Sequence, residues 1–315
     1  MRVMRTTLVR RFGGPEVLEI ATVADPEPGP GQVRVRVAGA AVNKIDISTR
    51  NGALAQAGLL APAPQTYLGW DVSGQVDALG PGASRFTSGD AVVGLRDVLS
   101  AGGTQADYVV LDESAVAPAP TTVSLVEAAA LPLMALTADR SLRLAGLHRG
   151  QTVLVTGAGG GVGGVVLQLA ALRGIRTIAV ADDERLVRDL GATDFVPRKV
   201  FSPAAVRRLA PGGVDAVIDA AVVGVPAHEA LRGGGTFVAL VAPFAPPPLR
   251  ATTVIVQEVF ADGGRLAELA ALVDAGRITL RIQETLPLAD IAVAHELTAK
   301  GGLRGKLVLS PGLLP

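Results

Sequence analysis

Cysteine is absent from the 315-residue sequence. Without thiols the chain can form neither a disulfide nor a zinc or iron–sulfur site with cysteine ligands. Histidine is scarce too, and the three present, His148, His228 and His295, are scattered without the spacing of metal ligands. The sequence therefore predicts a protein that binds no metal.

Charged residues make up only 18% of the chain, and 29 basic residues balance 29 acidic ones. This balance gives no electrostatic attraction for nucleic acid or an anionic membrane, so neither is an expected partner. The N-terminal stretch Met1–Arg11 lacks the apolar run of a secretory signal. Val153–Leu172 is uncharged and about as long as a bilayer span, but its concentrated glycines favour a tight turn over a lipid-facing helix. We expect a soluble, cytoplasmic protein.

The hydrophobic pattern changes along the chain. Up to about residue 120, short alternating segments such as Gln32–Ala41 lie between turns rich in glycine and proline, which is typical of a small antiparallel barrel or sandwich. From about Ser124, helices alternate with buried strands, which predicts a parallel sheet with helices on both faces. A helix over Arg265–Ala275 and a strand over Lys306–Leu309 suggest a return to the first domain. The strands and helices expected in the middle region are Thr152–Thr156, Val162–Arg173, Thr177–Ala181, Glu184–Leu190, Val214–Asp219 and Thr236–Val241.

A glycine-rich turn joins the expected strand Thr152–Thr156 to the helix that follows it. Two registers of a dinucleotide-binding fingerprint fit this turn. One is G-x-G-x-x-G at Gly159, Gly161 and Gly164, and the other is A-x-G-x-x-G at Ala158, Gly160 and Gly163. A backbone without side chains lets N–H groups approach a pyrophosphate at the helix N-terminus. The residues predicted to bind the cofactor here are Ala158, Gly160, Gly161, Val162 and Gly163.

The next strand, Thr177–Ala181, ends at Asp182. An acidic residue at this place accepts hydrogen bonds from a free ribose 2′-hydroxyl and repels a 2′-phosphate, whereas Arg185 could meet that phosphate. Both are candidate cofactor-binding residues, and they leave the choice between NADH and NADPH open. A short-chain reductase is excluded, because neither Tyr67 nor Tyr108 has a lysine four residues later.

Several motifs follow one another along nearly the whole chain: LVRRFGGPEV at Leu8–Val17, the segment from Asn43 to Gly52, GWDVSG at Gly69–Gly74, AALPL at Ala129–Leu133, and Gly305-Lys306. This series resembles the medium-chain dehydrogenase/reductase superfamily, in its quinone oxidoreductase branch. The resemblance implies an α/β protein with a GroES-like catalytic domain over residues 1–121 and 264–315. A Rossmann-type, doubly wound domain would occupy residues 122–263. It also implies a homodimer and a cofactor, usually NADPH, that lies between the domains.

The resemblance further implies roles for individual residues. Thr137 and Lys306 would bind the cofactor, Asn43 would hydrogen-bond a substrate carbonyl or the nicotinamide ribose, and Trp70 would line the substrate pocket. Two plainer alternatives remain open. Asn43 and Asp46 would then cap a short helix after a strand, and Trp70 would be an ordinary core residue.

The chain departs from its apparent family at two places. The positions that hold cysteine, histidine and cysteine in zinc-containing members are Asn43, Trp70 and Leu133 here, and none of these is a good zinc ligand. Many quinone oxidoreductases have a tyrosine two residues after the aspartate that matches Asp46, where this chain has Ser48. A serine hydroxyl is too weak an acid to replace a tyrosine proton donor directly.

We therefore expect a zinc-independent oxidoreductase that transfers hydride from NADPH, or from NADH, to a quinone or an α,β-unsaturated carbonyl compound. The candidate catalytic residues are Asn43, Ser48 and Trp70. Two alternatives stay open. One is an enoyl reductase that performs a tailoring step in a biosynthetic pathway, and the other, suggested by Ser48, is a cofactor-binding protein with little catalytic activity.

Overall fold

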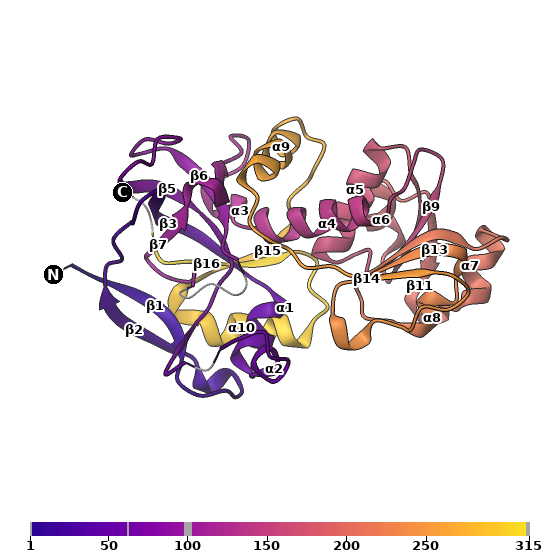
Figure 1. Cartoon of the computed structure of the whole chain (residues 1–315), viewed down its shortest axis with the longest axis horizontal. Coiled ribbons are helices and arrows are strands. Elements are labelled where there is room, and N and C mark those ends of the chain that lie inside the picture. The colour runs from indigo at the N-terminus through magenta and orange to yellow at the C-terminus, as the bar shows by residue number, and fades with distance from the viewer. Residues whose placement is uncertain (1, 62, 98–102, 313–315) are drawn as a thin grey trace. The chain divides into compact units, whose positions relative to one another are not determined.

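The structure, a computed structural model, describes residues 2–61, 63–97 and 103–312. The chain forms two compact units (Figure 1). The first unit contains residues 1–133, 260–276 and 280–315, and the second contains residues 134–259 and 277–279. The first change of unit thus falls after residue 133, whereas the sequence suggested a domain boundary after residue 121. The short helix α3 (Leu125–Ala128) explains the difference, because it packs against strands of the first unit.

The first unit is built on two sheets. One has the strand order β2-β1-β4, and the other has the order β15-β16-β3-β5-β6-β8 with β7 also paired to β3. Its strands are β1 (Val3–Val9), β2 (Glu19–Ala24), β3 (Gln32–Val42), β4 (Thr66–Tyr67), β5 (Asp71–Leu79), β6 (Ala91–Leu95), β7 (Tyr108–Asp112), β8 (Val116–Pro118), β15 (Ile282–Pro287) and β16 (Lys306–Ser310). Its remaining helices are α1 (Lys44–Arg50), α2 (Ala53–Gln56), α9 (Gly263–Asp274) and α10 (Ile291–Lys300). Among the strand pairs of the described residues, every pairing except β15 with β16 is antiparallel, and β16 pairs with β3.

Strand β3 is buried more deeply than its alternating sequence predicted. Val33, Val35 and Val37 face the core as expected, but Arg34, expected on an exposed face, is buried too. Its guanidinium lies 2.6 Å from the Asp77 carboxylate. This ion pair explains how a charged side chain is tolerated at a buried position.

The second unit contains one sheet of six parallel strands. Its strands are β9 (Thr152–Thr156), β10 (Arg176–Ala181), β11 (Asp194–Pro197), β12 (Val214–Asp219), β13 (Leu231–Ala239) and β14 (Thr253–Val256). Its helices are α5 (Gly161–Leu172), α6 (Glu184–Asp189), α7 (Pro203–Leu209) and α8 (Val225–His228), and α4 (Pro132–Leu144) enters it from the first unit. The order β11-β10-β9-β12-β13-β14 is the doubly wound Rossmann order. The sequence predicted this fold but missed β11 and β14 and began β13 too late.

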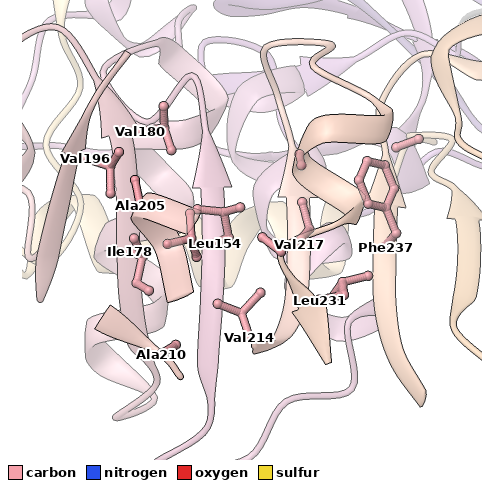
Figure 2. Packing of buried hydrophobic residues seen from close by; sticks show 14 residues of the cluster. Leu154, Ile178, Val180, Val196, Ala205, Ala210, Val214, Val217, Leu231 and Phe237 are labelled. Carbon is pink, nitrogen blue, oxygen red and sulfur yellow. The ribbon is translucent and has the colours of Figure 1, made fainter. Parts of the chain in front are cut away.

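The central strands of this sheet, β9, β10 and β12, are buried on both faces. Leu154, Ile178 and Phe237, from β9, β10 and β13, form one cluster with Ala205 of α7 (Figure 2). Val153 is the neighbour of Leu154, so its side chain points to the opposite face, where it is also fully buried. Burial on both faces is why these strands are nearly continuous runs of apolar residues. Within the described part of the chain, no helix has both the length and the apolar character to cross a membrane.

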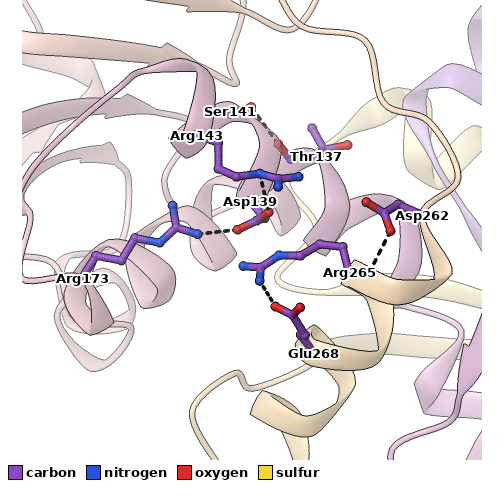
Figure 3. A network of polar contacts seen from close by, with 8 residues as sticks. All are labelled: Thr137, Asp139, Ser141, Arg143, Arg173, Asp262, Arg265 and Glu268. Carbon is purple, nitrogen blue, oxygen red and sulfur yellow. Dashed lines mark hydrogen bonds and ion pairs between the residues drawn. The ribbon is translucent and has the colours of Figure 1, made fainter.

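A buried carboxylate joins two helices of the second unit (Figure 3). Asp139 of α4 is completely buried and forms ion pairs with Arg173, which follows α5, and with Arg143 one turn later on α4. In the first unit, the Asp262 carboxylate accepts the Arg265 N–H at 2.9 Å at the start of α9. Each carboxylate therefore fixes a helix within its own unit.

We expect the Asp139→Asn substitution to lower the free energy of unfolding by about 2 kcal/mol, because it leaves Arg173 facing a buried amide without its counter-charge. The matched control Arg143→Gln removes only the more exposed partner and should cost about 0.5 kcal/mol or less. Urea unfolding followed by circular dichroism measures both variants. Equal effects of the two substitutions would contradict this account of the network.

Candidate functional site

The glycine-rich turn is shaped by close packing. Strand β9 ends at Thr156, and Gly157 has a φ of +61°, a conformation that side chains disfavour. A Cβ on Gly163 would lie 2.4 Å from the Gly157 carbonyl oxygen, so α5 fits against the turn only because Gly163 has none. Gly160 is the residue directly before the helix. These roles favour the register Ala158, Gly160 and Gly163.

The turn and the start of α5 suit an anionic ligand. Helix α5 is 12 residues long and carries no acidic side chain in its first turn, so its positive end is not neutralised from within. Gly160, Gly161 and Val162 are accessible to solvent, whereas Ala158 and Gly163 are buried beneath them. The predicted cofactor-binding residues thus include three at the surface of the turn and two that shape it. Backbone N–H groups at a glycine-rich helix start of this kind can approach a pyrophosphate closely.

The neighbouring strand ends place Asp182 and Arg185 differently. Asp182 directly follows β10 and forms an ion pair with Arg198 at 3.1 Å. Arg185 lies on α6 with 93% of its side chain exposed, and its guanidinium is 4.0 Å from Asp189. The sequence interpretation missed Arg198. The basic pair Arg198-Lys199 is visible in the sequence, but the strand that it follows, β11, was not recognised.

Thr137 lies on α4 in the second unit and is buried. Its carbonyl oxygen accepts a 2.7 Å hydrogen bond from the Ser141 hydroxyl (Figure 3). This bond lies within one helix and does not involve the hydroxyl of Thr137. The predicted contact of Thr137 with the cofactor therefore stays a prediction.

A buried polar cluster of the first unit contains Asn43, Asp46, Asp71 and Lys306. The sheet brings them together: β3 ends beside the start of β16, and β5 lies on the other side of β3. The Asn43 amide donates to the Asp71 carboxylate at 2.7 Å and accepts from the Lys306 ammonium. Asn43 is therefore the link between a cation and a carboxylate.

The Asp46 side chain caps the N-terminus of helix α1. Its carboxylate accepts N–H groups of Asn43 at 2.7 Å and Gly69 at 3.0 Å, and the Gln105 amide at 3.3 Å. The plainer alternative, that Asn43 and Asp46 cap a short helix, is thus part of the structure. It is not the whole of it, because the Asn43 side chain turns to Asp71 and Lys306.

Burial controls the protonation of this cluster. It raises the pKa of Asp46 to about 7, and the neighbouring Asp71 charge adds to this effect against the opposing Asn43 N–H bond. Burial also raises the pKa of Asp71 and lowers the pKa of Lys306, in both cases against the attraction between the two. Lys306 as a whole is partly exposed to solvent, but its ammonium group is buried near the carboxyl groups of Asp71 and Asp46. Two carboxyl groups that share one ammonium favour retention of an extra proton near neutral pH.

Asp71 is the member that the sequence interpretation missed. Its carboxylate also accepts the Leu133 N–H, at 2.5 Å, in the first turn of α4. The available signal was its position inside the GWDVSG motif, directly after Trp70. An aspartate at the start of a buried strand needs partners, and the pattern did not reveal which residues supply them.

Ser48 and Trp70 stand apart from these contacts. The Ser48 hydroxyl donates to the Lys44 carbonyl of its own helix at 3.3 Å, and the residue is partly exposed. Trp70 is only 2% exposed, and its indole N–H has no hydrogen-bond partner in the part of the chain that the structure describes. The structure thus brings Asn43 and Lys306 together and leaves Ser48 outside their cluster.

The residues at the three zinc-ligand positions do not form a metal site. The Asn43 amide is committed to Asp71 and Lys306, and neither Trp70 nor Leu133 carries a suitable ligand atom. Over residues 2–61, 63–97 and 103–312, no three histidine, cysteine or acidic side chains are grouped so that they could hold a metal ion.

Comparisons with known proteins agree with this architecture. Residues 29–121 match the alcohol dehydrogenase GroES-like domain, and residues 187–309 match a family described as zinc-binding dehydrogenase. A 2-methylene-furan-3-one reductase from Solanum lycopersicum is 30% identical over 95% of this chain and 77% of its own length. A quinone oxidoreductase from Lama guanicoe is 30% identical over 98% of both chains. A mycobacterial protein solved in complex with NADPH is 29% identical, with a TM-score of 0.84 over 98% of this chain and all of its own. The chain therefore belongs to the medium-chain dehydrogenase/reductase superfamily, in its quinone oxidoreductase branch.

Proposed function

We propose that this protein transfers hydride from NADPH to a quinone or an α,β-unsaturated carbonyl compound. The observation that carries the proposal is the glycine-rich turn between β9 and α5, at the carboxyl edge of a doubly wound sheet. The relatives support it, because they include quinone oxidoreductases and a reductase whose named substrate, a 2-methylene-furan-3-one, is an unsaturated ketone. NADPH is favoured as the cofactor because a similar protein was solved with it.

The residues proposed to hold the cofactor are Ala158, Gly160, Gly161, Val162 and Gly163 in the turn, with Thr137 and Lys306 as further contacts. When bound, NADPH supplies the hydride. The turn and the N-terminus of α5 orient the pyrophosphate without the reorganisation that a flexible loop would need. Lys306 can contribute because its ammonium has three donors, of which Asn43 takes one.

The proposed catalytic residues leave the substrate oxygen without a strong acid. Asn43 has its amide committed within the cluster, so its proposed role becomes the positioning of Lys306 and Asp71. Ser48 is bonded to its own helix, and Trp70 is proposed to form a wall of the substrate pocket. A quinone or an enone suits such a site, because each spreads the incoming negative charge over its own conjugated atoms.

A homodimer and a cytoplasmic location remain part of the proposal. Strand β14 is an edge strand of the six-stranded sheet in the second unit. Large apolar side chains on β14 and in the segment before it are exposed: Val241, Phe244, Leu249 and Val256. An exposed apolar edge suits contact with a second copy. The formal net charge of zero supports a location away from anionic membranes.

The proposed mechanism predicts which acceptors are reduced. We expect turnover with quinones or enones and negligible turnover with simple ketones, because an isolated ketone places the full charge on one oxygen. Ser48→Ala should lower the rate by less than about tenfold, since serine is not the principal acid. Steady-state oxidation of NADPH against an enone and its saturated ketone tests this. Faster reduction of the saturated ketone would overturn the mechanism.

The residues at the zinc-ligand positions predict a protein that works without zinc, despite the description of the matched family. Metal analysis of the purified protein should find far less than one zinc per chain. Activity towards an enone should be unchanged after incubation with a chelator, because no cysteine or grouped histidine holds a metal. Stoichiometric zinc whose removal abolishes activity would refute this expectation.

The raised pKa of Asp46 predicts a pH-dependent stability. An aspartate with a folded-state pKa of about 7 and an ordinary value near 3.8 is most favourable to folding at low pH. That contribution is lost as the pH rises through about 7. Relative to Asp46→Asn, the wild-type free energy of unfolding should therefore fall by about 2 kcal/mol between pH 5 and pH 8. Urea unfolding of both proteins at the two pH values measures the difference, and a difference independent of pH would contradict the assignment.

A further inference from the structure

Asp182 and Arg198 follow the ends of two neighbouring parallel strands. Strands β10 and β11 are paired so that Ala181 lies opposite Pro197. The next residue on each strand is then one member of the ion pair, with the guanidinium nitrogen 3.1 Å from the carboxylate oxygen. The pair is thus fixed by strand register rather than by chance contact on a loop. Both side chains are more than half exposed, at 66% for Arg198 and 57% for Asp182, so solvent and ligands reach them.

The other charged residues near this strand end have different partners. Asp183 accepts the Leu186 N–H at 3.0 Å at the start of α6, and Glu184 pairs with Arg188 at 3.2 Å. Arg185 is directed towards Asp189, at 4.0 Å. Of the two arginines that could meet an anion beside Asp182, only Arg198 contacts Asp182.

The same edge adjoins the cofactor turn. A Cβ on Gly159 would lie 3.6 Å from the Cβ of Ala181, so the turn and the end of β10 are in contact distance. In doubly wound nucleotide-binding domains, the residue at the end of the second strand meets the adenosine ribose. Asp182 holds that position here. Alone, its carboxylate would select a free 2′-hydroxyl and repel a 2′-phosphate.

We propose that Arg198 is the residue that binds the 2′-phosphate of NADPH. The Asp182 carboxylate, which pairs with Arg198 when no ligand is bound, competes with this phosphate for the guanidinium. The inference rests on the proposed function and names the residue that sets cofactor choice. A planar guanidinium that already forms a charge-assisted contact with a carboxylate exchanges it for a phosphate, whose charge is larger and whose oxygens fit the same fork. The exchange leaves Asp182 next to the phosphate, so this carboxylate weakens NADPH binding without abolishing it.

Dissociation constants of purified full-length variants test the proposal without any turnover. Arg198→Ala should weaken binding of NADPH and of 2′,5′-ADP by about tenfold or more, the loss expected for a charge-assisted contact, and should change binding of NADH and 5′-AMP less than about twofold. Asp182→Asn should tighten NADPH binding and weaken NADH binding. Arg185→Ala is the matched control and should leave the ratio of the two constants unchanged.

Isothermal titration calorimetry gives all four constants, and circular dichroism checks that each variant is folded. An unchanged NADPH-to-NADH ratio in Arg198→Ala, or a changed ratio in Arg185→Ala alone, overturns the proposal. Either result leaves the proposed function standing, because NADPH still binds. If wild-type protein binds neither NADPH nor NADH, the proposed function fails and this inference fails with it.

Discussion

The close contact between Gly163 and the Gly157 carbonyl is the constraint on which the second unit depends. Because Gly163 has no Cβ, α5 starts directly against the turn that leaves β9. The N-terminus of α5 therefore lies at the carboxyl edge of the sheet, beside the end of β10. One missing side-chain atom thus sets both the packing of helix on strand and the shape of the anion cradle. A larger residue at position 163 would alter both together.

The first unit depends on a different balance, between burial and hydrogen bonding. Asp46 and Asp71 are fully buried, and such carboxyl groups are tolerated only with several partners. Main-chain N–H groups of Asn43, Gly69 and Leu133 supply most of them. Two of the three positions that hold zinc ligands in other members of the superfamily, Asn43 and Leu133, thus hydrogen-bond within a polar cluster that contains one lysine. Under the proposed function, quinone and enone acceptors would stabilise the incoming negative charge through their own conjugation, without a metal.

At the carboxyl edge of the six-stranded sheet, the proposed function requires a site for the anionic cofactor. Asp182 lies at the same edge, and its negative charge opposes anion binding. Pairing Asp182 with Arg198 resolves this conflict, since the carboxylate has a cation beside it before any ligand binds. The sequence interpretation weighed Asp182 against Arg185, which lie on the same segment. The residue in contact with Asp182 is instead Arg198, which directly follows the next strand, β11, and the interpretation did not recognise this strand.

Local patterns determined the sheet-and-helix alternation, the glycine turn and the absence of a cysteine-based metal site, because these depend on neighbouring residues and on composition alone. They could not show that Arg34 is buried against Asp77, that Ser48 bonds its own helix, or that Asn43 joins Asp71 to Lys306. The last contact joins residues 263 positions apart. Strand pairing brings such residues together, and only then do burial and hydrogen bonding fix each side chain's direction and charge. That is why the sequence named Asn43 and Lys306 separately, and the tertiary structure made them one cluster.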